Sequence, residues 1–234
     1  MNIEDAKVLV TGGTNGIGWA TAKLLSERGA RVAICGRNEE RLREAENEFD
    51  CLAVKSDVAN ESDVVKLVAS VIENLNGYNV LVNNAGFAKG APLVNMTADM
   101  MEDVFRTNVV GAMLVARESA KHFLEQKYGT ILNVGSTAGD KGMPMGTAYA
   151  SSKAALKSMT ETWRDELRTS NIRVMLVKPS EVVTNFAKTA GFPQEDKPTK
   201  LHGIDIAHAI VHAIEQPDVA FIPEIPVWAT NPNG

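Results

Sequence analysis

Residues 7 to 18 read KVLVTGGTNGIG, and this stretch decides the fold class. A short apolar run at 7–10 passes directly into a cluster of glycines and then into a helical pattern. Glycines in such a turn let backbone amides and the N-terminus of a helix approach a pyrophosphate closely. The alternative is a turn that is merely flexible. The position of the glycines between a first strand and its helix favours phosphate binding.

The same alternation of short apolar runs and amphipathic stretches continues along the chain. The apolar runs predict buried parallel strands at residues 7–10, 31–35, 51–54, 79–82, 130–134 and 172–177. The amphipathic stretches predict helices at approximately 17–28, 38–48, 61–75, 98–125, 149–169 and 204–216. We therefore expect an α/β fold with a doubly wound, mostly parallel sheet that helices cover on both faces.

Length and composition restrict the class of protein. The 234 residues, 44% of them hydrophobic, can bury one full core, and we expect a single domain over 1–234. The net charge is -5 and no basic stripe is present, which argues against a nucleic-acid partner. No apolar run approaches the roughly 20 residues of a membrane-spanning helix. The first residues also lack the basic-then-apolar pattern of a signal peptide, so we expect a cytoplasmic protein without membrane association.

Two cysteines and two histidines are the residues to test for metal binding. Cys35 and Cys51 lie at the edges of apolar runs, where a buried thiol is commoner than a disulfide or a metal ligand. His208 and His212 are four residues apart, but HAIVH lacks the glutamate of a zinc-protease helix and no third ligand is evident. We expect no metal site and a surface or subunit-contact role for the histidines.

Several motifs appear in a fixed order along the chain. They are TGGTNGIG (11–18), NNAG (83–86), Asn108, Ser136 and the Y-x-x-x-K pair Tyr149 and Lys153. In order and spacing they resemble the short-chain dehydrogenase/reductase family, over most of the chain. The glycine spacing G-x-x-x-G-x-G, which differs from the common dinucleotide fingerprint, fits the same resemblance. The resemblance implies a Rossmann fold, a nicotinamide cofactor and hydride transfer.

The resemblance makes Tyr149 and Lys153 a catalytic pair rather than an exposed pair on a helix. Tyr149 would give a proton to a carbonyl oxygen during reduction, or remove one from an alcohol during oxidation. The phenol has a reference pKa near 10, which is high for this task. An ammonium at about 4 Å would stabilise the phenolate by roughly 4 kcal/mol at an effective dielectric of about 20, before desolvation opposes it. Lys153 would also bind the nicotinamide ribose.

Two further catalytic residues follow from the resemblance. Ser136 would hold the substrate oxygen and stabilise developing negative charge. From the sequence alone, neighbouring Thr137 could be mistaken for the active hydroxyl. Asn108 matches the asparagine that supports a water and proton path to the lysine. The alternative for Asn108 is a helix-interior asparagine that satisfies a local backbone group.

The end of the second predicted strand bears on the identity of the cofactor. A carboxylate about 20 residues beyond the glycine turn would bind the adenosine ribose of NAD and repel a 2′-phosphate. Here Gly36 stands at that position and Arg37 follows, whose guanidinium suits the 2′-phosphate of NADP. The alternative is an exposed arginine at the start of a charged helix that includes Glu39 and Glu40. We predict NADP (NADPH).

The other cofactor contacts are carried over from the family residue by residue. The predicted cofactor-binding residues are Gly12, Thr14, Asn15, Gly16, Ile17, Gly18, Arg37, Asp57, Val58, Asn84, Ala85, Gly86, Tyr149, Lys153, Pro179, Val182 and Thr184. Ser180 replaces the usual glycine of P-G-x-V-x-T, so the path of that loop stays open. The family's substrate lid corresponds to 185–200, which is short here and carries Phe186 and Phe192.

The residues and the resemblance together predict an NADP-dependent oxidoreductase that reduces a ketone or aldehyde. 3-Ketoacyl-carrier-protein reductases and small carbonyl or sepiapterin-type reductases look most similar, although FIPEIPVWATNPNG lacks the usual ending of the ketoacyl reductases. A cofactor-binding regulator without turnover is an alternative, but it would lose its acid or its lysine. An epimerase or dehydratase of the longer branch would need another glycine spacing and a C-terminal domain. The resemblance also implies a homodimer or homotetramer built on the two long helices.

Overall fold

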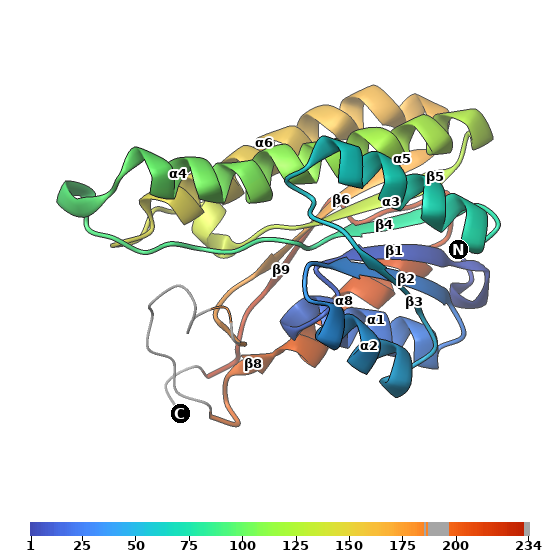
Figure 1. Ribbon diagram of the computed structural model, residues 1–234, viewed down its shortest axis with the longest axis horizontal. Helices are drawn as coiled ribbons and strands as arrows, with labels where there is room; N and C mark the ends of the chain where they lie inside the picture. Colours follow the sequence, from blue (N-terminus) through green and yellow to red (C-terminus); the bar gives the residue numbers. More distant parts are fainter. Residues whose placement is uncertain (185, 187–196, 232–234) are drawn as a thin grey trace.

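A central sheet of seven parallel strands organises the computed structural model, which describes residues 1–184, 186 and 197–231 (Figure 1). The strand order is β3-β2-β1-β4-β5-β6-β9. The strands are β1 (Lys7–Thr11), β2 (Arg31–Gly36), β3 (Leu52–Lys55), β4 (Val80–Asn83), β5 (Gly129–Val134), β6 (Ile172–Pro179) and β9 (Glu224–Val227). A separate parallel pair joins β7 (Val182–Val183) to β8 (Leu201–His202). The predicted doubly wound α/β fold is confirmed.

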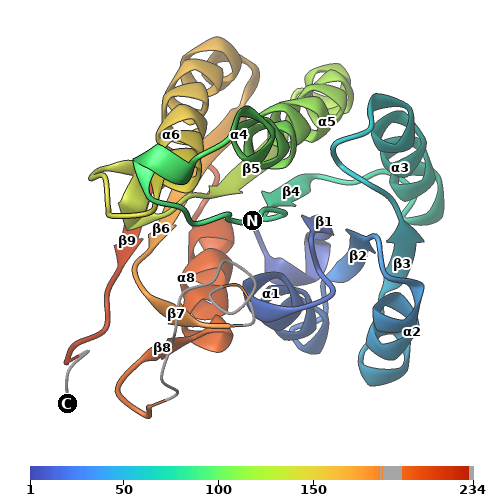
Figure 2. The same ribbon diagram turned by 60° about the vertical axis from the view of Figure 1, so that its left-hand side comes forward.

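Helices cover both faces of the sheet, as Figure 2 shows. One layer holds α3 (Glu61–Asn74), α4 (Ala98–Phe105), α5 (Ala112–Gln126) and α6 (Thr147–Leu167). The other layer holds α1 (Gly16–Glu27), α2 (Glu39–Glu48) and α8 (Gly203–Glu215). Short 3-10 turns lie at η1 (Ile3–Asp5), η2 (Leu93–Asn95), η4 (Thr137–Gly139) and η5 (Arg168–Ser170). None of the helices in the described ranges is long and apolar enough to cross a bilayer.

Side-chain caps fix the starts of three helices. The Asn38 side chain accepts a hydrogen bond from the backbone N–H of Arg41, and Asn60 accepts from Ser62 and Asp63 in the same way. Thr97 caps α4 through the N–H of Met100. Asparagine and threonine favour this position because their side-chain oxygens satisfy amides that have no partner inside the helix.

The alternation of side chains along β1 explains why its apolar run is continuous. Val8, Leu9 and Val10 are all completely buried. Val8 and Val10 pack in the core with residues of α1 and α8, whereas Leu9 packs on the opposite face with residues of α3 and α5. A strand with helices on both faces has no solvent side and therefore carries no polar alternation.

The predicted helix at 98–125 is present, but its middle is π-helical rather than α-helical. The π-helical segment η3 (Arg106–Gly111) separates α4 from α5. Within it Asn108 is 1% exposed and bonds to the backbone of Phe87 in another loop. Hydrophobic periodicity averages over such an insertion, because the apolar face on either side still repeats with a helical period.

β9 completes the sheet and was absent from the predicted strands. Its sequence EIPV contains Pro226, and Pro223 precedes it. Proline lacks the backbone N–H that a central strand needs for its hydrogen bonds. A proline in the sequence therefore indicates a turn or an edge strand. Among the described residues, β9 pairs only with β6 and forms the edge of the sheet, where proline is tolerated. Most of the predicted lid, residues 185 and 187–196, lies outside the described residues.

The sheet topology determines where a site can form. β1 pairs with both β2 and β4, so the order of the strands reverses between β1 and β4. In open parallel sheets, the crevice at the carboxyl ends of the strands at this switch point is the usual ligand site. The loops that follow β1, β4, β5 and β6 all reach this edge.

Candidate active site

The turn between β1 and α1 has three positions that require glycine. Gly12 and Gly16 have φ values of 64° and 54°, in the left-handed region that glycine adopts readily. A Cβ atom at Gly18 would lie 2.3 Å from the carbonyl oxygen of Gly12. The turn is therefore narrow, and the N-terminus of α1 stays open to a ligand beyond β1.

Asn84, which follows β4, holds this turn in place. Its Nδ2 donates to the carbonyl oxygens of Thr11 and Gly12 at 2.9 and 3.3 Å. The Thr11 hydroxyl accepts hydrogen bonds from the backbone N–H groups of Asn84 and Ala85, each at 3.0 Å. The predicted NNAG motif thus joins β4 to the turn, and its last residue, Gly86, lines the cavity described below.

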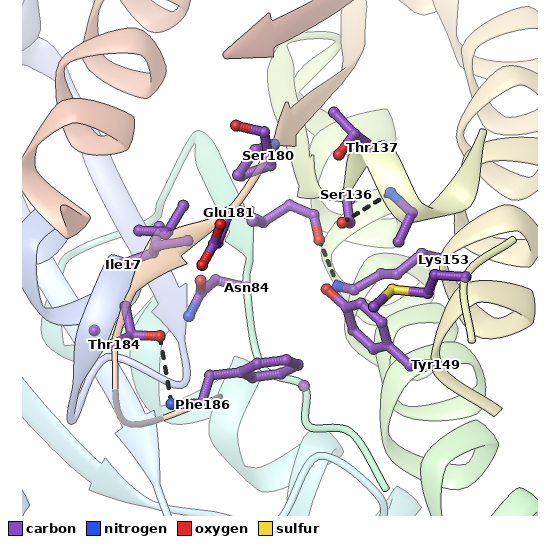
Figure 3. Close-up of a pocket in the computed structure, with 18 of the residues that line it drawn as sticks. Ile17, Asn84, Ser136, Thr137, Tyr149, Lys153, Ser180, Glu181, Thr184 and Phe186 are labelled. Carbon is purple, nitrogen blue, oxygen red and sulfur yellow. Dashed lines mark hydrogen bonds between the residues drawn. The ribbon is translucent and has the colours of Figure 1, made fainter. Parts of the chain in front are cut away.

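α6 presents Tyr149 and Lys153 on one face, one turn apart (Figure 3). Lys153 is 6% exposed, and its Nζ donates a 2.7 Å hydrogen bond to the carbonyl oxygen of Val134 at the end of β5. The same nitrogen lies 5.8 Å from the centroid of the Tyr149 ring. The two side chains are therefore neighbours, but the ammonium points to the backbone of β5.

Burial dominates the titration of this pair. It raises the pKa of the Tyr149 phenol, and the hydrogen bond with Ser136 acts in the opposite direction. Burial lowers the pKa of Lys153 to about 8. The expectation that Lys153 sets the phenol pKa is therefore wrong for the protein alone, because desolvation outweighs a charge that points to Val134.

Ser136 lies on the loop between β5 and α6. It is the N-cap of η4, and its Oγ accepts a 3.1 Å hydrogen bond from the backbone N–H of Ala138. This bond fixes the hydroxyl on the side of the loop that faces Tyr149 and Lys153 (Figure 3). Thr137 also lines the cavity, so both hydroxyls stay candidates by position, and Ser136 remains the predicted one.

Asn108 lies behind the cavity rather than on its wall. Its Nδ2 donates to the Phe87 carbonyl and to the Ser152 hydroxyl at 2.9 and 3.0 Å, and its Oδ1 accepts from the Phe87 N–H at 3.0 Å. A Cβ atom on Gly86 would lie 3.0 Å from Asn108 Oδ1 and 3.7 Å from Lys153 Nζ. Asn108 is thus close to the lysine, but its side chain bonds to the backbone of Phe87 and to Ser152 of α6.

The loops after β1, β4, β5 and β6 meet at a cavity of about 370 Å³ (Figure 3). The predicted residues that line it are Asn15, Gly16, Ile17, Asn84, Gly86, Ser136, Tyr149, Lys153, Pro179, Val182 and Thr184. The predicted residues that do not line it are Gly12, Thr14, Gly18, Arg37, Asp57, Val58, Ala85 and Asn108. Of these, Val58 is buried in the core beneath α3 and α5.

Other lining residues were not among the predicted site residues. They are Val134, Gly135, Thr137, Ala138, Met143, Ser180, Glu181 and Phe186. Glu181 contributes the one carboxylate among the described lining residues, and it forms a 2.7 Å ion pair with Lys200. The ring of Phe186 packs 5.2 Å from that of Tyr149. The variable position of P-G-x-V-x-T could have indicated Glu181, since its neighbours on both sides belong to the motif.

The region beyond β2 is exposed and lies outside the cavity. The Arg37 side chain is 74% exposed and lies 4.0 Å from Asp57, a long and weak ion pair. A Cβ atom at Gly36 would lie 2.7 Å from Cγ2 of Thr14. A larger residue at position 36, such as the aspartate typical of NAD-dependent relatives, would therefore displace Thr14.

These features fit a dinucleotide. Gly12 and Gly18 let the turn pack closely where a Cβ would lie 3.0 Å or less from backbone atoms, and the N-terminus of α1 offers amides to a phosphate. The cavity continues from this turn to Tyr149 and Lys153, which is the path that a cofactor and a substrate would share.

Metal-binding residues do not gather in the part of the chain that the structure describes, which holds no group of three or more His, Cys, Asp or Glu side chains suited to a metal. His208 and His212 are both exposed on α8. Both cysteines are free thiols, and burial raises the pKa of Cys35 to about 12. Cys35 is therefore an unreactive core residue.

Known proteins resemble this chain over nearly its whole length. The family model described as short chain dehydrogenase matches residues 6–194. An uncharacterized oxidoreductase of Staphylococcus aureus (strain USA300) is 31% identical over 228 residues, which cover 96% of this chain and 97% of that protein. A 3-oxoacyl-[acyl-carrier-protein] reductase of Bos taurus is 35% identical over 221 residues, covering 92% and 93%. The closed form of a serine dehydrogenase complexed with NADP+ has a TM-score of 0.88 at 27% identity, covering 94% and 93%. The predicted resemblance is confirmed, and the chain belongs to the short-chain dehydrogenase/reductase family of oxidoreductases.

Proposed function

We propose that this protein is an NADP-dependent reductase of a ketone or aldehyde. The observation that carries the proposal is the meeting of Ser136, Tyr149 and Lys153 on a cavity that the glycine turn also borders. The phenol of Tyr149, which can transfer a proton, lies on the same cavity as Asn15, Gly16 and Ile17, where a nucleotide can bind. A cofactor-binding regulator would not need that combination, and all four catalytic residues of the family are present.

The reduction adds a hydride and a proton to a carbonyl group. A bound nicotinamide cofactor supplies the hydride to the carbonyl carbon. Tyr149 releases its phenolic proton to the carbonyl oxygen, which becomes the hydroxyl of the product. Ser136 donates a hydrogen bond to the same oxygen and so stabilises the charge that develops on it.

Lys153 supports the phenolate that remains on Tyr149. With a pKa of about 8, it is mostly protonated at neutral pH, and its nitrogen is 5.8 Å from the Tyr149 ring. Its bond to Val134 holds the ammonium at the back of the cavity, from which its remaining protons can reach a ribose hydroxyl.

Three observations support NADP over NAD. Gly36 leaves no carboxylate at the end of β2, and Thr14 fills the space that an aspartate there would need. Arg37 is largely exposed, so its guanidinium can turn to a 2′-phosphate. The similar serine dehydrogenase was solved with NADP+.

Carbonyl substrates with apolar groups fit the lining of the cavity. Met143, Phe186 and Val182 provide apolar contacts around the polar centre. A 3-ketoacyl thioester is the second candidate, because the bovine relative is named as such a reductase.

A panel of ketones, aldehydes and 3-ketoacyl thioesters, each with NADPH and with NADH, tests the proposal. Loss of the absorbance of the reduced cofactor should occur with at least one carbonyl class, and faster with NADPH. If the protein binds NADPH but turns over none of these substrates, the cofactor-binding regulator would be favoured instead.

We also infer a homodimer or homotetramer that forms through the helices near 98–125 (α4, η3 and α5) and 149–169 (α6). These helices lie side by side in one layer over the sheet (Figure 2). Sedimentation that shows only monomer at micromolar concentration would contradict this. The two free thiols are consistent with a reducing compartment such as the cytoplasm.

A further inference from the structure

A chain of alternating charges lies behind the loop that carries Ser136. Asp140, which directly follows η4, binds two lysines, one with each carboxylate oxygen. Oδ1 is 2.6 Å from Nζ of Lys157, and Oδ2 is 3.0 Å from Nζ of Lys178. Lys178 also binds Glu224 at 2.5 Å. The four side chains come from the loop after β5, from α6, from β6 and from β9.

This network is not an ordinary surface ion pair. The Lys178 side chain is only 11% exposed, and the side chains of Lys157 and Asp140 are 33% and 37% exposed. The hydrogen bonds with Lys157 and Lys178 lower the pKa of Asp140, so its carboxylate stays charged under ordinary conditions. An ion pair that joins several charges with partial burial holds its geometry better than an isolated exposed pair.

Asp140 is linked rigidly to Ser136. The backbone N–H of Gly139 donates to the Ser136 carbonyl at 3.0 Å, and that of Asp140 donates to the Thr137 carbonyl at 3.1 Å. A Cβ atom at Gly139 would lie 2.9 Å from the backbone carbonyl of Lys153, so the loop packs directly on α6. A shift of Asp140 would therefore move Ser136 relative to α6.

The two lysines of the network anchor the loop to both walls of the site. Lys157 follows Lys153 by one turn of α6, on the face that also carries Tyr149. Lys178 precedes Pro179, which lines the cavity at the end of β6. Asp140 thus connects α6, which carries Tyr149, to the end of β6.

We propose that Asp140 is a positioning residue: by binding Lys157 and Lys178 it fixes the loop 136–140 against α6 and sets the contact between Ser136 and Tyr149. The role in turnover rests on the proposed function, whereas the role in geometry does not. Asp140 touches neither substrate nor cofactor in this proposal and acts only through Ser136.

The geometry can be measured without a substrate. The chain has three tyrosines, so a protein labelled with ¹³C at the tyrosine ζ carbon gives three signals, and Tyr149→Phe identifies that of Tyr149. Ser136→Ala shows the direction in which the signal moves when the serine hydroxyl is lost. Asp140→Asn and Lys157→Gln should each move the Tyr149 signal in that same direction.

The paired variants separate displacement from a change of charge. Asp140→Asn removes a negative charge and Lys157→Gln a positive one, so a purely electrostatic effect would move the signal in opposite directions. Glu215→Gln is the matched control, since Glu215 binds Arg28 at 2.8 Å with 33% exposure, between α8 and the end of α1. It should leave the signal in place.

Turnover gives the second readout. Asp140→Asn should lower kcat about tenfold, because misplacement of a contacting group by a fraction of an ångström is enough for such a loss. In a Ser136→Ala background the same substitution should cost less than about twofold, since the group through which it acts is absent. Equal factors in both backgrounds would mean a general structural effect and would overturn the proposal.

A Tyr149 signal that stays in place in both Asp140→Asn and Lys157→Gln would also overturn it, as would movement in opposite directions. A parent protein without turnover on any substrate would contradict the proposed function, while the NMR comparison would still decide the role of Asp140.

Discussion

The Nζ of Lys153 lies 2.7 Å from the carbonyl oxygen of Val134, so the buried ammonium of α6 is anchored to the last residue of β5. This bond crosses from the helix that carries Tyr149 to the strand that leads into Ser136. It compensates part of the cost of burying the charge, and it fixes which way the lysine points.

Lys153 should make stability depend on pH. Its pKa is about 8 in the folded protein and about 10.5 in the unfolded chain, so between these values the unfolded chain binds more protons. The free energy of unfolding of the parent should therefore rise as the pH increases from about 8 to about 10.5, by up to about 3 kcal/mol. Lys153→Met should lack this rise. Denaturant unfolding of both proteins across this range measures it, and parallel curves would contradict the assignment.

Tyr149→Phe should lower turnover by about 10²- to 10⁴-fold, because it removes only the hydroxyl that transfers the proton. NADPH binding, measured by fluorescence, should stay close to that of the parent. Tyr128→Phe is the matched control. Tyr128 directly precedes β5, at the end of that strand far from Ser136, and its hydroxyl bonds to Asp218. A Tyr149→Phe protein with turnover within a few-fold of the parent would exclude Tyr149 as the proton donor.

Arg37→Ala should weaken NADPH binding by about 1.5–3 kcal/mol and leave NADH binding almost unchanged, because only NADPH carries the 2′-phosphate. Titration of both cofactors measures the difference. Arg41→Ala is the control: Arg41 is also exposed and binds Glu44 within α2. Equal losses for NADPH and NADH would remove Arg37 from the proposed contact.

Gly18→Ala should lower the free energy of unfolding by about 1–3 kcal/mol and weaken cofactor binding, because its Cβ would lie 2.3 Å from the Gly12 carbonyl oxygen. Gly142→Ala is the control, since within the described part of the chain nothing beyond its two sequence neighbours lies within 4 Å of the Cβ that it adds. Thermal unfolding and NADPH titration of the two variants test the requirement. Similar results for both would mean that the turn can relax around a side chain.

Most of the sheet could be predicted because its strands are buried on both faces. The runs that form β1, β2 and β6 are mostly apolar, so the local sequence is enough to predict that each is a buried strand. β9 and the π-helical segment around Asn108 could not be predicted in this way. The prolines in and before β9 argue against a strand in the sequence, although an edge strand tolerates them. The π-helical segment depends on hydrogen bonds between Asn108 and the backbone of Phe87, which lies in a loop 21 residues earlier.

The residue types of the site followed from motif spacing, but their orientations did not. Tyr149 and Lys153 share a helix face because they are four residues apart. That Lys153 bonds to Val134 depends on the packing of α6 against β5, and that Glu181 binds Lys200 depends on the pairing of β7 with β8. Both are tertiary contacts between residues that are far apart in sequence.

The π-helical segment η3 has a consequence for which changes in length this stretch can tolerate. A π-helical turn holds about one residue more than an α-helical turn, so η3 absorbs one residue without rotating α5 away from the sheet. Deletion of one residue in 106–111 should therefore restore a regular helix and leave buried Leu114 and Val115 facing the sheet, but it would withdraw Asn108 from Phe87. The extra residue thus serves the position of Asn108 beside the site and not the packing of α5, so loss of one residue here should keep the fold and disturb the site.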